Sequence, residues 1–256
     1  MRLLSLLTLL ACDEAASDTP EPAPVPAETT PVSGAVAVGP FTVTPVYHGT
    51  VRIDHKGTTF WIDPWSKGAL ADAPKADVIL ITDIHQDHLD EAAIDAVSKD
   101  GTVFVAPAAV SGKRAAPAEH ILANGDTVEV AGISITAVPM YNLVRGPEEG
   151  TLFHDKGRGN GYILESDGTR LYFAGDTECT EEMKALTGID AAFLPMNLPY
   201  TMPPEEAAAC IAAFKPALAV PYHYAGSDLS EFTAALEGVT GVTVQLAEFY
   251  PGGLPW

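Results

Sequence analysis

Apolar residues follow two alternating periods along the chain, one typical of strands and the other typical of helices. Val78-Ile79-Leu80-Ile81 contains no polar position, as a strand covered on both faces requires, and segment 91–99 then spaces its apolar residues as a helix does. The same patterns predict strands at 41–47, 51–54, 58–63, 78–82, 103–106, 126–130, 134–138, 161–165, 170–174, 191–194, 218–221 and 242–246. They predict helices at 91–99, 108–115, 180–186, 204–214 and 229–236.

The order of these elements predicts the architecture. Each of two successive halves places strands first and helices after them. The apolar face of a sheet must be buried, and two such halves can bury theirs against each other with the helices outside. With 256 residues, 47% of them hydrophobic, the chain can build one large core. We therefore expect one domain with two sheets packed face to face.

The first residues are expected to be a targeting signal. The apolar stretch 3–11 is too short to span a bilayer, and it closes on Leu9-Leu10-Ala11-Cys12. This pattern resembles a bacterial lipoprotein signal, which implies cleavage before Cys12, a lipid on that cysteine and export to the cell envelope; an ordinary secretory leader is the alternative. Residues 1–12 would form the signal, 13–39 a Pro- and Ala-rich disordered linker, and 40–256 the folded domain.

The charge and the cysteines restrict the partners. Acidic residues outnumber basic ones by 34 to 14, which gives a formal net charge of -20 and disfavours a nucleic-acid partner. Part of this acid is expected to bind cations, because clustered carboxylates repel one another unless a metal neutralises them. Apart from Cys12, only Cys179 and Cys210 remain, and in an exported protein they can pair or stay reduced.

Potential metal ligands gather at the ends of three predicted strands. Thr82–Asp90 holds two histidines and three aspartates directly after a buried strand, Gly175-Asp176 ends a second strand, and His223 ends a third. Any one of these alone is more often a turn or a structural histidine. Because α/β sheets bind ligands at the carboxyl ends of their strands, the three together predict a metal site.

The same residues resemble those of a known family. D-x-H-x-D-H at Asp83–His88, followed by Asp176 and His223, resembles the motif set of the metallo-β-lactamase-fold hydrolases, whose usual first motif is H-x-H-x-D-H. The resemblance covers roughly 43–246, and His48-Gly49-Thr50 and Phe60-Trp61-Ile62-Asp63-Pro64 are similar to the branch of ascorbate-phosphate lactonase-like and phospholipase-D-like members. It implies a four-layer αββα sandwich of the α+β or α/β class, with a metal site along one edge.

The resemblance also implies which residues bind metal. Asp87, His88 and His223 fall on the ligands of the second metal position, and Asp176 falls on the carboxylate that bridges two metals. Zn²⁺ is the expected ion for mixed imidazole and carboxylate ligands, in one or two copies, with iron or manganese as options.

The first metal position departs from the family pattern. Asp83 stands where a histidine is usual, His85 matches, and Asn142 stands where a third histidine is expected. A carboxylate such as Asp83 can bind zinc, but the neutral oxygen of Asn142 is a weaker ligand. His154, in the following loop, either replaces Asn142 as the ligand, contacts the substrate or has a structural role.

The loop at 154–161, which precedes the predicted strand 161–165, is the candidate substrate contact. His154, Lys156 and Arg158 lie there beside glycines. In so acidic a chain, the two basic residues are candidates for binding the anionic group of a small molecule. The alternative is a solvated hairpin loop.

These residues together predict a metal-dependent hydrolase. A metal-activated water held near Asp87 and Asp176 would attack an ester, lactone or phosphodiester. The altered residues Asp83 and Asn142 motivate an alternative, a membrane-anchored metal- or ligand-binding lipoprotein of the same fold without catalysis. The only membrane contact expected in either case is the N-terminal lipid.

Overall fold

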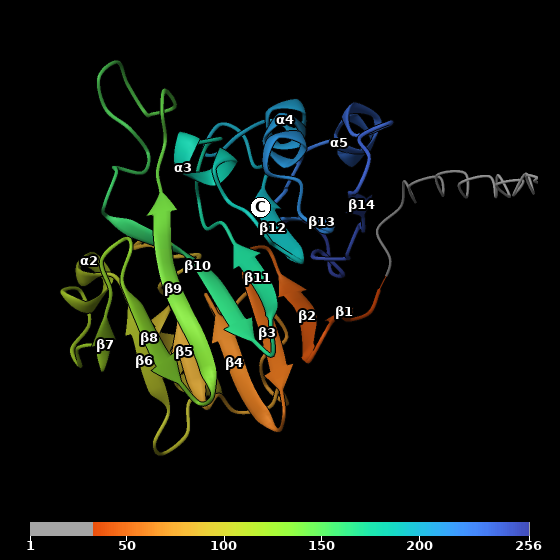
Figure 1. The fold of residues 1–256 in the computed structure, drawn as a ribbon. Helices are drawn as coiled ribbons and strands as arrows, with labels where there is room; N and C mark the ends of the chain where they lie inside the picture. Colours follow the sequence, from red (N-terminus) through yellow and green to blue (C-terminus); the bar gives the residue numbers. More distant parts are fainter. Residues whose placement is uncertain (1–32, 256) are drawn as a thin grey trace, which may run out of the picture.

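The computed structural model describes residues 33–255, which contain two seven-stranded sheets (Figure 1). The predicted signal and the predicted linker up to residue 32 lie outside the described residues. The first sheet consists, in spatial order, of β1 (Val36–Val38), β2 (Phe41–Tyr47), β3 (Thr50–His55), β4 (Thr58–Ile62), β5 (Val78–Leu80), β6 (Val103–Ala106) and β7 (His120–Ile121). The second consists of β8 (Thr127–Val130), β9 (Ile133–Met140), β10 (Gly159–Ser166), β11 (Thr169–Phe173), β12 (Ala191–Pro195), β13 (Leu218–Tyr222) and β14 (Thr243–Val244).

Each sheet joins an antiparallel meander to a set of parallel strands. Strands β1 to β4 pair antiparallel and β4 to β7 parallel. The second sheet repeats this plan, with β8 to β11 antiparallel and β11 to β14 parallel. Parallel neighbours end at the same edge of a sheet, so the loops after β4 and β5, and those after β11 and β13, are each brought together.

The alternation of side chains in β5 shows how the layers are held. Val78 and Leu80 belong to the large core cluster between the sheets, whereas Ile79 and the following Ile81 belong to a separate cluster that contains Ile94 of the first helix. Successive side chains of a strand point to opposite faces, so a strand with both faces covered must be apolar throughout. The uninterrupted apolar run is therefore explained by burial on both sides.

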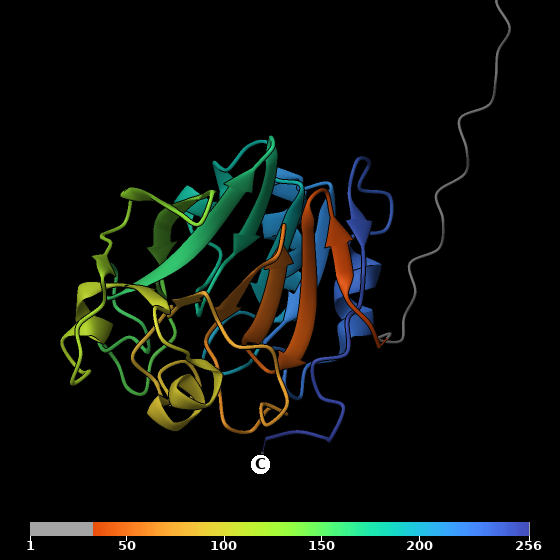
Figure 2. The same ribbon diagram turned by 90° about the horizontal axis from the view of Figure 1, so that it is seen from below.

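Helices cover the outer faces of the two sheets. They are α1 (Glu91–Val97), α2 (Ala108–Ser111), α3 (Glu181–Lys184), α4 (Pro204–Phe214) and α5 (Leu229–Ala235). Figure 2 shows α1, coloured gold, and the blue helices α4 and α5 on opposite sides of the paired sheets. The predicted four-layer sandwich is confirmed.

Helix α1 begins directly after the predicted ligand segment. Its N-cap Asp90 accepts hydrogen bonds from the backbone N–H groups of Ala92 and Ala93, and its second oxygen accepts from the backbone and hydroxyl of Ser66. Such a cap satisfies the free N–H groups of the first turn. It also fixes the residues just before the helix, which include His88.

Three sequence predictions differ from the structure. Strand β1 lies inside the predicted linker 13–39 and pairs with β2, so the folded domain starts before residue 40. Strand β7 was not predicted, because two residues carry no periodic signal. The helix predicted at 108–115 ends at Ser111, with Gly112 as its C-cap.

Two features bear on the chain's environment. Cys179 and Cys210 form a disulfide with 5.7 Å between their Cα atoms, which resolves the alternative that the sequence left open. The bond joins the segment after β11 to helix α4. Among the described residues, every helix falls short of the length and apolar character needed to cross a membrane.

Candidate metal centre

The predicted ligands come from strand ends and loops at one edge of the sandwich. Asp83, His85, Asp87 and His88 follow β5, Asp176 follows β11, His223 follows β13 directly, and His154 belongs to the loop between β9 and β10. Gly175 permits the turn before Asp176: its φ is 65°, and a Cβ there would lie 2.4 Å from the sulfur of Met140.

The structure brings the four residues assigned to the second metal position together. His88 Nε2 lies 3.3 Å from Asp176 Oδ2, and His223 Nε2 lies 3.3 Å from both Asp176 Oδ1 and Asp87 Oδ2. Ligands arranged tetrahedrally at about 2.1 Å from one zinc ion are about 3.4 Å from one another. The four side chains therefore have the spacing of one coordination shell.

Asp63 fixes the orientation of His88. Its Oδ2 lies 2.8 Å from His88 Nδ1, and its two oxygens accept hydrogen bonds from the Thr82 backbone N–H (2.8 Å) and hydroxyl (2.5 Å). A carboxylate that binds one ring nitrogen of a histidine leaves the lone pair of the other for a metal. This directs His88 Nε2 towards Asp176.

His154, rather than Asn142, faces the first metal position. His154 Nε2 lies 3.3 Å from Asp176 Oδ2, the same oxygen that His88 approaches. Asn142 lies behind it: its Oδ1 is 2.6 Å from His154 Nδ1, and its Nδ2 donates to Glu178 and to the Tyr200 carbonyl. Asn142 therefore orients the histidine, and the amide does not reach the shared oxygen.

Asp83 is held by a residue that was predicted to contact the substrate. Arg158 Nε and Nη2 each donate to one oxygen of Asp83 at 3.0 Å, while Asp83 Oδ2 also lies 2.8 Å from His85 Nδ1. The Asp83 side chain is fully buried, and the guanidinium neutralises its charge. Lys156, the second basic residue of that loop, is paired with Glu182 at 2.5 Å.

Buried atoms without partners test whether these residues fit a metal. Among the described residues, His88 Nε2, His154 Nε2 and Asp176 Oδ1 are buried and accept no hydrogen bond. An unpaired buried polar group costs about 1 to 3 kcal/mol. Divalent cations at the two metal positions would satisfy all three, and histidine with carboxylate suits zinc, iron or manganese. The residues present therefore fit the predicted ions.

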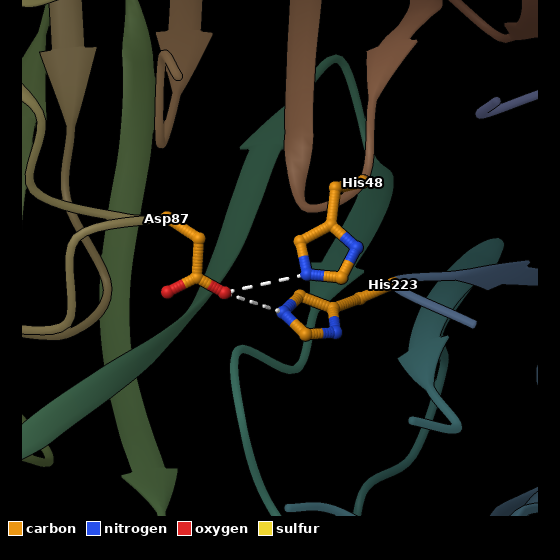
Figure 3. Close-up of side chains that lie close together, drawn as sticks. All are labelled: His48, Asp87 and His223. Carbon is orange, nitrogen blue, oxygen red and sulfur yellow. Dashed lines mark hydrogen bonds and ion pairs between the residues drawn. The ribbon is translucent and has the colours of Figure 1, made fainter. Parts of the chain in front are cut away.

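His48 joins the same cluster from the turn between β2 and β3 (Figure 3). Its Nε2 lies 3.3 Å from Asp87 Oδ2, its ring centroid lies 3.6 Å from that of His223, and its Nδ1 lies 2.6 Å from the Tyr250 hydroxyl. The motif comparison gave no role to this histidine in binding metal. The sequence signals for it are its position at a strand end and the similarity of His48-Gly49-Thr50 to one branch of the family.

Three residues of the site adopt the left-handed backbone conformation that side chains disfavour. The φ angles are 56° at His48, 47° at Asp63 and 47° at His223. Such conformations persist only where the surrounding structure enforces them, and they concentrate at functional sites. Here the His223 backbone N–H donates to the His48 carbonyl at 3.0 Å, which ties the two turns together.

The electrostatic environment keeps the carboxylates ionised and His48 neutral. Burial, and then the neighbouring His223, lower the pKa of His48 to about 4. Burial would raise the pKa of Asp87 and of Asp176, but the nearby histidines outweigh it and both pKa values are lowered. Ionised carboxylates are the form that binds metal. Burial would lower the pKa of the ligand His88, but the same carboxylates outweigh it and raise that pKa well above its usual value, so a metal ion there must displace a proton.

The centre opens into a cavity of ≈ 380 Å³. Residues of the metal site and uncharged side chains both line it. The uncharged side chains are Trp65, Gln86, Phe153, Asn197 and Tyr200, and the residues of the metal site are His48, His85, Asp87, His154, Asp176 and His223. This volume lies in the range of small-molecule sites.

Comparison with known proteins agrees with this arrangement. Residues 42–223 match the family model described as Beta-lactamase superfamily domain. A UPF0173 metal-dependent hydrolase of Enterococcus faecalis is 33% identical over 187 residues, which cover 69% of this chain and 83% of the relative. Another, from Thermococcus onnurineus, is 34% identical over 175 residues, or 64% of this chain and 75% of the relative.

A solved structure shows the same similarity in three dimensions. A crystal structure from Parabacteroides distasonis, of a candidate metal-dependent hydrolase, superposes with a TM-score of 0.76 at 41% sequence identity. The match covers 81% of this chain and 93% of that one.

Proposed function

Because the chain belongs to the UPF0173 metal-dependent hydrolases of the β-lactamase superfamily, we propose that it cleaves a small ester, lactone or phosphodiester at a centre of two divalent ions. One ion would be held by Asp87, His88, Asp176 and His223. The other would be held by His85, His154 and Asp176, and Asp83 would lie next to this second set of ligands. The observation that carries this proposal is that one oxygen, Asp176 Oδ2, lies 3.3 Å from both His88 Nε2 and His154 Nε2. Zinc is the ion we propose for these ligands.

When bound, such ions supply Lewis acidity and lower the pKa of water. The protein's own residues orient the reaction around Asp87. Asp87 Oδ2 lies 3.3 Å from His48 Nε2, and no described residue donates to Oδ1. Asp87 lines the cavity and is 27% exposed, so Oδ1 can accept a hydrogen bond from an attacking water and orient it.

His48 serves as a positioning residue in this scheme. Tyr250 holds its Nδ1, so that Nε2 faces Asp87 and keeps that carboxylate in one orientation. A carboxylate that is fixed in place loses little entropy when the substrate binds, which is how positioning lowers a barrier. Replacing His48 would therefore slow catalysis even where the metal content is preserved.

The test is metal analysis combined with a substrate panel. Purified protein is expected to contain up to two ions per chain and to hydrolyse at least one member of an esterase, lactonase and phosphodiesterase panel. Chelators and the His88→Ala substitution should abolish that activity, and re-addition of metal should restore it only in the unsubstituted protein. His120→Ala, a histidine of strand β7 outside the site, is the matched control. Tight metal binding without turnover on the whole panel would instead support the non-catalytic alternative.

We also propose that the protein is exported and carries a lipid on Cys12. The Leu9-Leu10-Ala11-Cys12 pattern supports this, and so does the Cys179–Cys210 disulfide, because such bonds persist in oxidising compartments. Cys12→Ser is expected to move the protein from the membrane fraction to the soluble fraction. An unchanged distribution would contradict a lipid at this residue.

A further inference from the structure

We propose, on the basis of the proposed hydrolase function, that the substrate is an uncharged carboxylic ester or lactone with an apolar, preferably planar, group. Three aromatic side chains and one buried amide line the same cavity as the metal ligands, and no described lysine or arginine does. The proposal replaces the anionic substrate that the sequence alone suggested.

The basic residues near the cavity are already neutralised. Arg158 binds both oxygens of Asp83, Lys156 pairs with Glu182, and Arg145 lies 3.2 Å from Glu178 and 2.8 Å from Glu206. Enzymes that bind phosphate generally use free arginine or lysine donors for it. Metal ions attract carbonyl and phosphoryl oxygens alike. The side chains that line the cavity must therefore determine whether an ester or a phosphodiester binds. These walls offer nothing to balance a second negative charge in a chain of net charge -20.

The aromatic walls favour an apolar group. Phe153 and Tyr200 pack edge to face with ring centroids 5.0 Å apart, and Trp65 lies 5.3 Å from His48. All three line the cavity. Aromatic rings placed in this way bind a planar apolar group through burial and through edge or stacked contacts.

Exposed apolar side chains are concentrated next to these walls. Among the described residues, four of the six exposed large hydrophobic side chains lie in two loops: Leu143, Val144, Leu198 and Tyr200. The Asn142 side chain donates to the Tyr200 carbonyl, so the two loops are joined directly. Apolar surface gathered in one place usually marks a binding site. Here one of the four side chains, Tyr200, also lines the cavity.

Asn197 supplies a neutral polar contact. It is 3% exposed, it lines the cavity, and its side-chain oxygen is buried without a hydrogen-bond partner. Its backbone is fixed, because its N–H donates to the Thr201 hydroxyl at 2.8 Å and its carbonyl accepts from the Thr201 N–H at 2.9 Å. The NH₂ group of this amide can donate to an uncharged carbonyl or ester oxygen, whereas its unpaired Oδ1 can accept from a hydroxyl or N–H of the ligand, and neither contact requires a charge.

A matched pair of chromogenic substrates tests the proposal on the metal-loaded protein. We expect p-nitrophenyl phenylacetate to be hydrolysed, with the rate enhancement over the uncatalysed reaction at least about 100-fold larger than for bis(p-nitrophenyl) phosphate. Tyr200→Ala should raise KM for the phenylacetate about 10-fold and leave KM for p-nitrophenyl acetate nearly unchanged. Ile121→Ala, which removes another exposed apolar side chain, should change neither. Asn197→Ala should lower kcat/KM about 10-fold for both esters.

The outcomes separate this proposal from the proposed function. Chelator-sensitive cleavage of the phosphodiester, with little ester cleavage, overturns the substrate class and leaves the hydrolase function standing. If neither substrate is cleaved, fluorescence titration with α-phenyl-γ-butyrolactone and with phenyl phosphate decides the class. Quenching by the lactone that is lost in Trp65→Phe supports an uncharged apolar ligand. Quenching by the phosphate alone, or by neither compound, overturns it.

Discussion

The two ligand groups that meet at Asp176 are built in different ways. His88 and His223 are both buried: His223 directly follows β13, and His88 lies in the segment between β5 and α1. Asp63 binds the ring of His88, and the His48 carbonyl accepts a hydrogen bond from the His223 backbone N–H. His154 and Arg158 belong instead to the long loop between β9 and β10, and the side chain of His85 is 44% exposed. One group is supported by the core of the sandwich, whereas the other depends on loop contacts.

Because of this difference, we expect the two positions to bind their metal ions with unequal affinity. Ligands that are fixed before binding lose less entropy when the ion arrives. The first position also substitutes Asp83, tied to Arg158, for the usual histidine. We therefore expect the group at His88 and His223 to bind its ion more tightly than the group at His85 and His154.

The largest effect is expected from breaking both groups at once. Asp176→Ala removes the oxygen that lies 3.3 Å from both His88 Nε2 and His154 Nε2. Activity should fall by roughly 1000-fold or more, because bound ions contribute several kcal/mol to the barrier. Metal content by plasma mass spectrometry should fall for both ions. An Asp176→Ala protein that keeps two ions would contradict the shared role of this carboxylate.

The next largest effect is a loss of stability when the ligand group that depends on loop contacts is changed. Arg158→Ala removes the guanidinium that binds both oxygens of the fully buried Asp83 carboxylate and leaves it only the contact with His85, so we expect the free energy of unfolding to fall by about 3 kcal/mol. Urea denaturation measures this. The double substitution Asp83→Asn with Arg158→Gln removes both charges and should recover most of the loss. Lys56→Ala, which breaks an exposed pair with Asp167, should change little.

The disulfide tests what stabilises the group supported by the core. Cys179→Ser with Cys210→Ser opens a cross-link between residues 31 apart in sequence, and loop-closure entropy predicts a loss of about 3 to 4 kcal/mol. Strand packing still holds His88 and His223, so the tighter ion should be retained. Thermal or urea unfolding, together with metal analysis, gives both quantities. Loss of the tighter ion in the folded double variant would show that the cross-link positions Asp176.

The smallest effect concerns the orientation of one histidine. Asn142→Ala removes the oxygen 2.6 Å from His154 Nδ1, and loss of such a partner typically lowers metal affinity 10- to 100-fold. Competition with a chelating dye should show this for the weaker ion only. Asn124→Ala, which removes an amide that bonds to the Val138 and Gly159 carbonyls, is the control. Equal weakening in both variants would mean that the loss is a general loosening of the strands.

Much of the fold could be predicted because burial leaves a periodic signal. Strand β5 is apolar at every position, and helix α4 was predicted with the bounds 204–214 that the structure has. Strand β1 was missed because three residues beside a Pro-rich segment show no period. The disulfide stayed open because pairing depends on which residues the fold brings together.

The candidate site could be predicted only in part, because the sequence does not show which distant residues the fold brings into contact. Asp87, Asp176 and His223 follow strong strand signals, so their convergence could be expected. Asn142 and His154 flank one loop, and sequence does not say which side chain faces the metal and which lies behind it. Arg158 was assigned to the substrate because its partner Asp83 lies 75 positions away. Asn197 carries no sequence signal, because its significance comes from burial without a partner.

The most direct test of the account is a crystal structure of the zinc-loaded protein with anomalous scattering at the zinc edge. The account predicts two peaks on either side of Asp176, one within coordination distance of His88 and His223 and a weaker one within reach of His85 and His154. Anomalous peaks located away from Asp176, or a single ion bound only by His85 and His154, would contradict it.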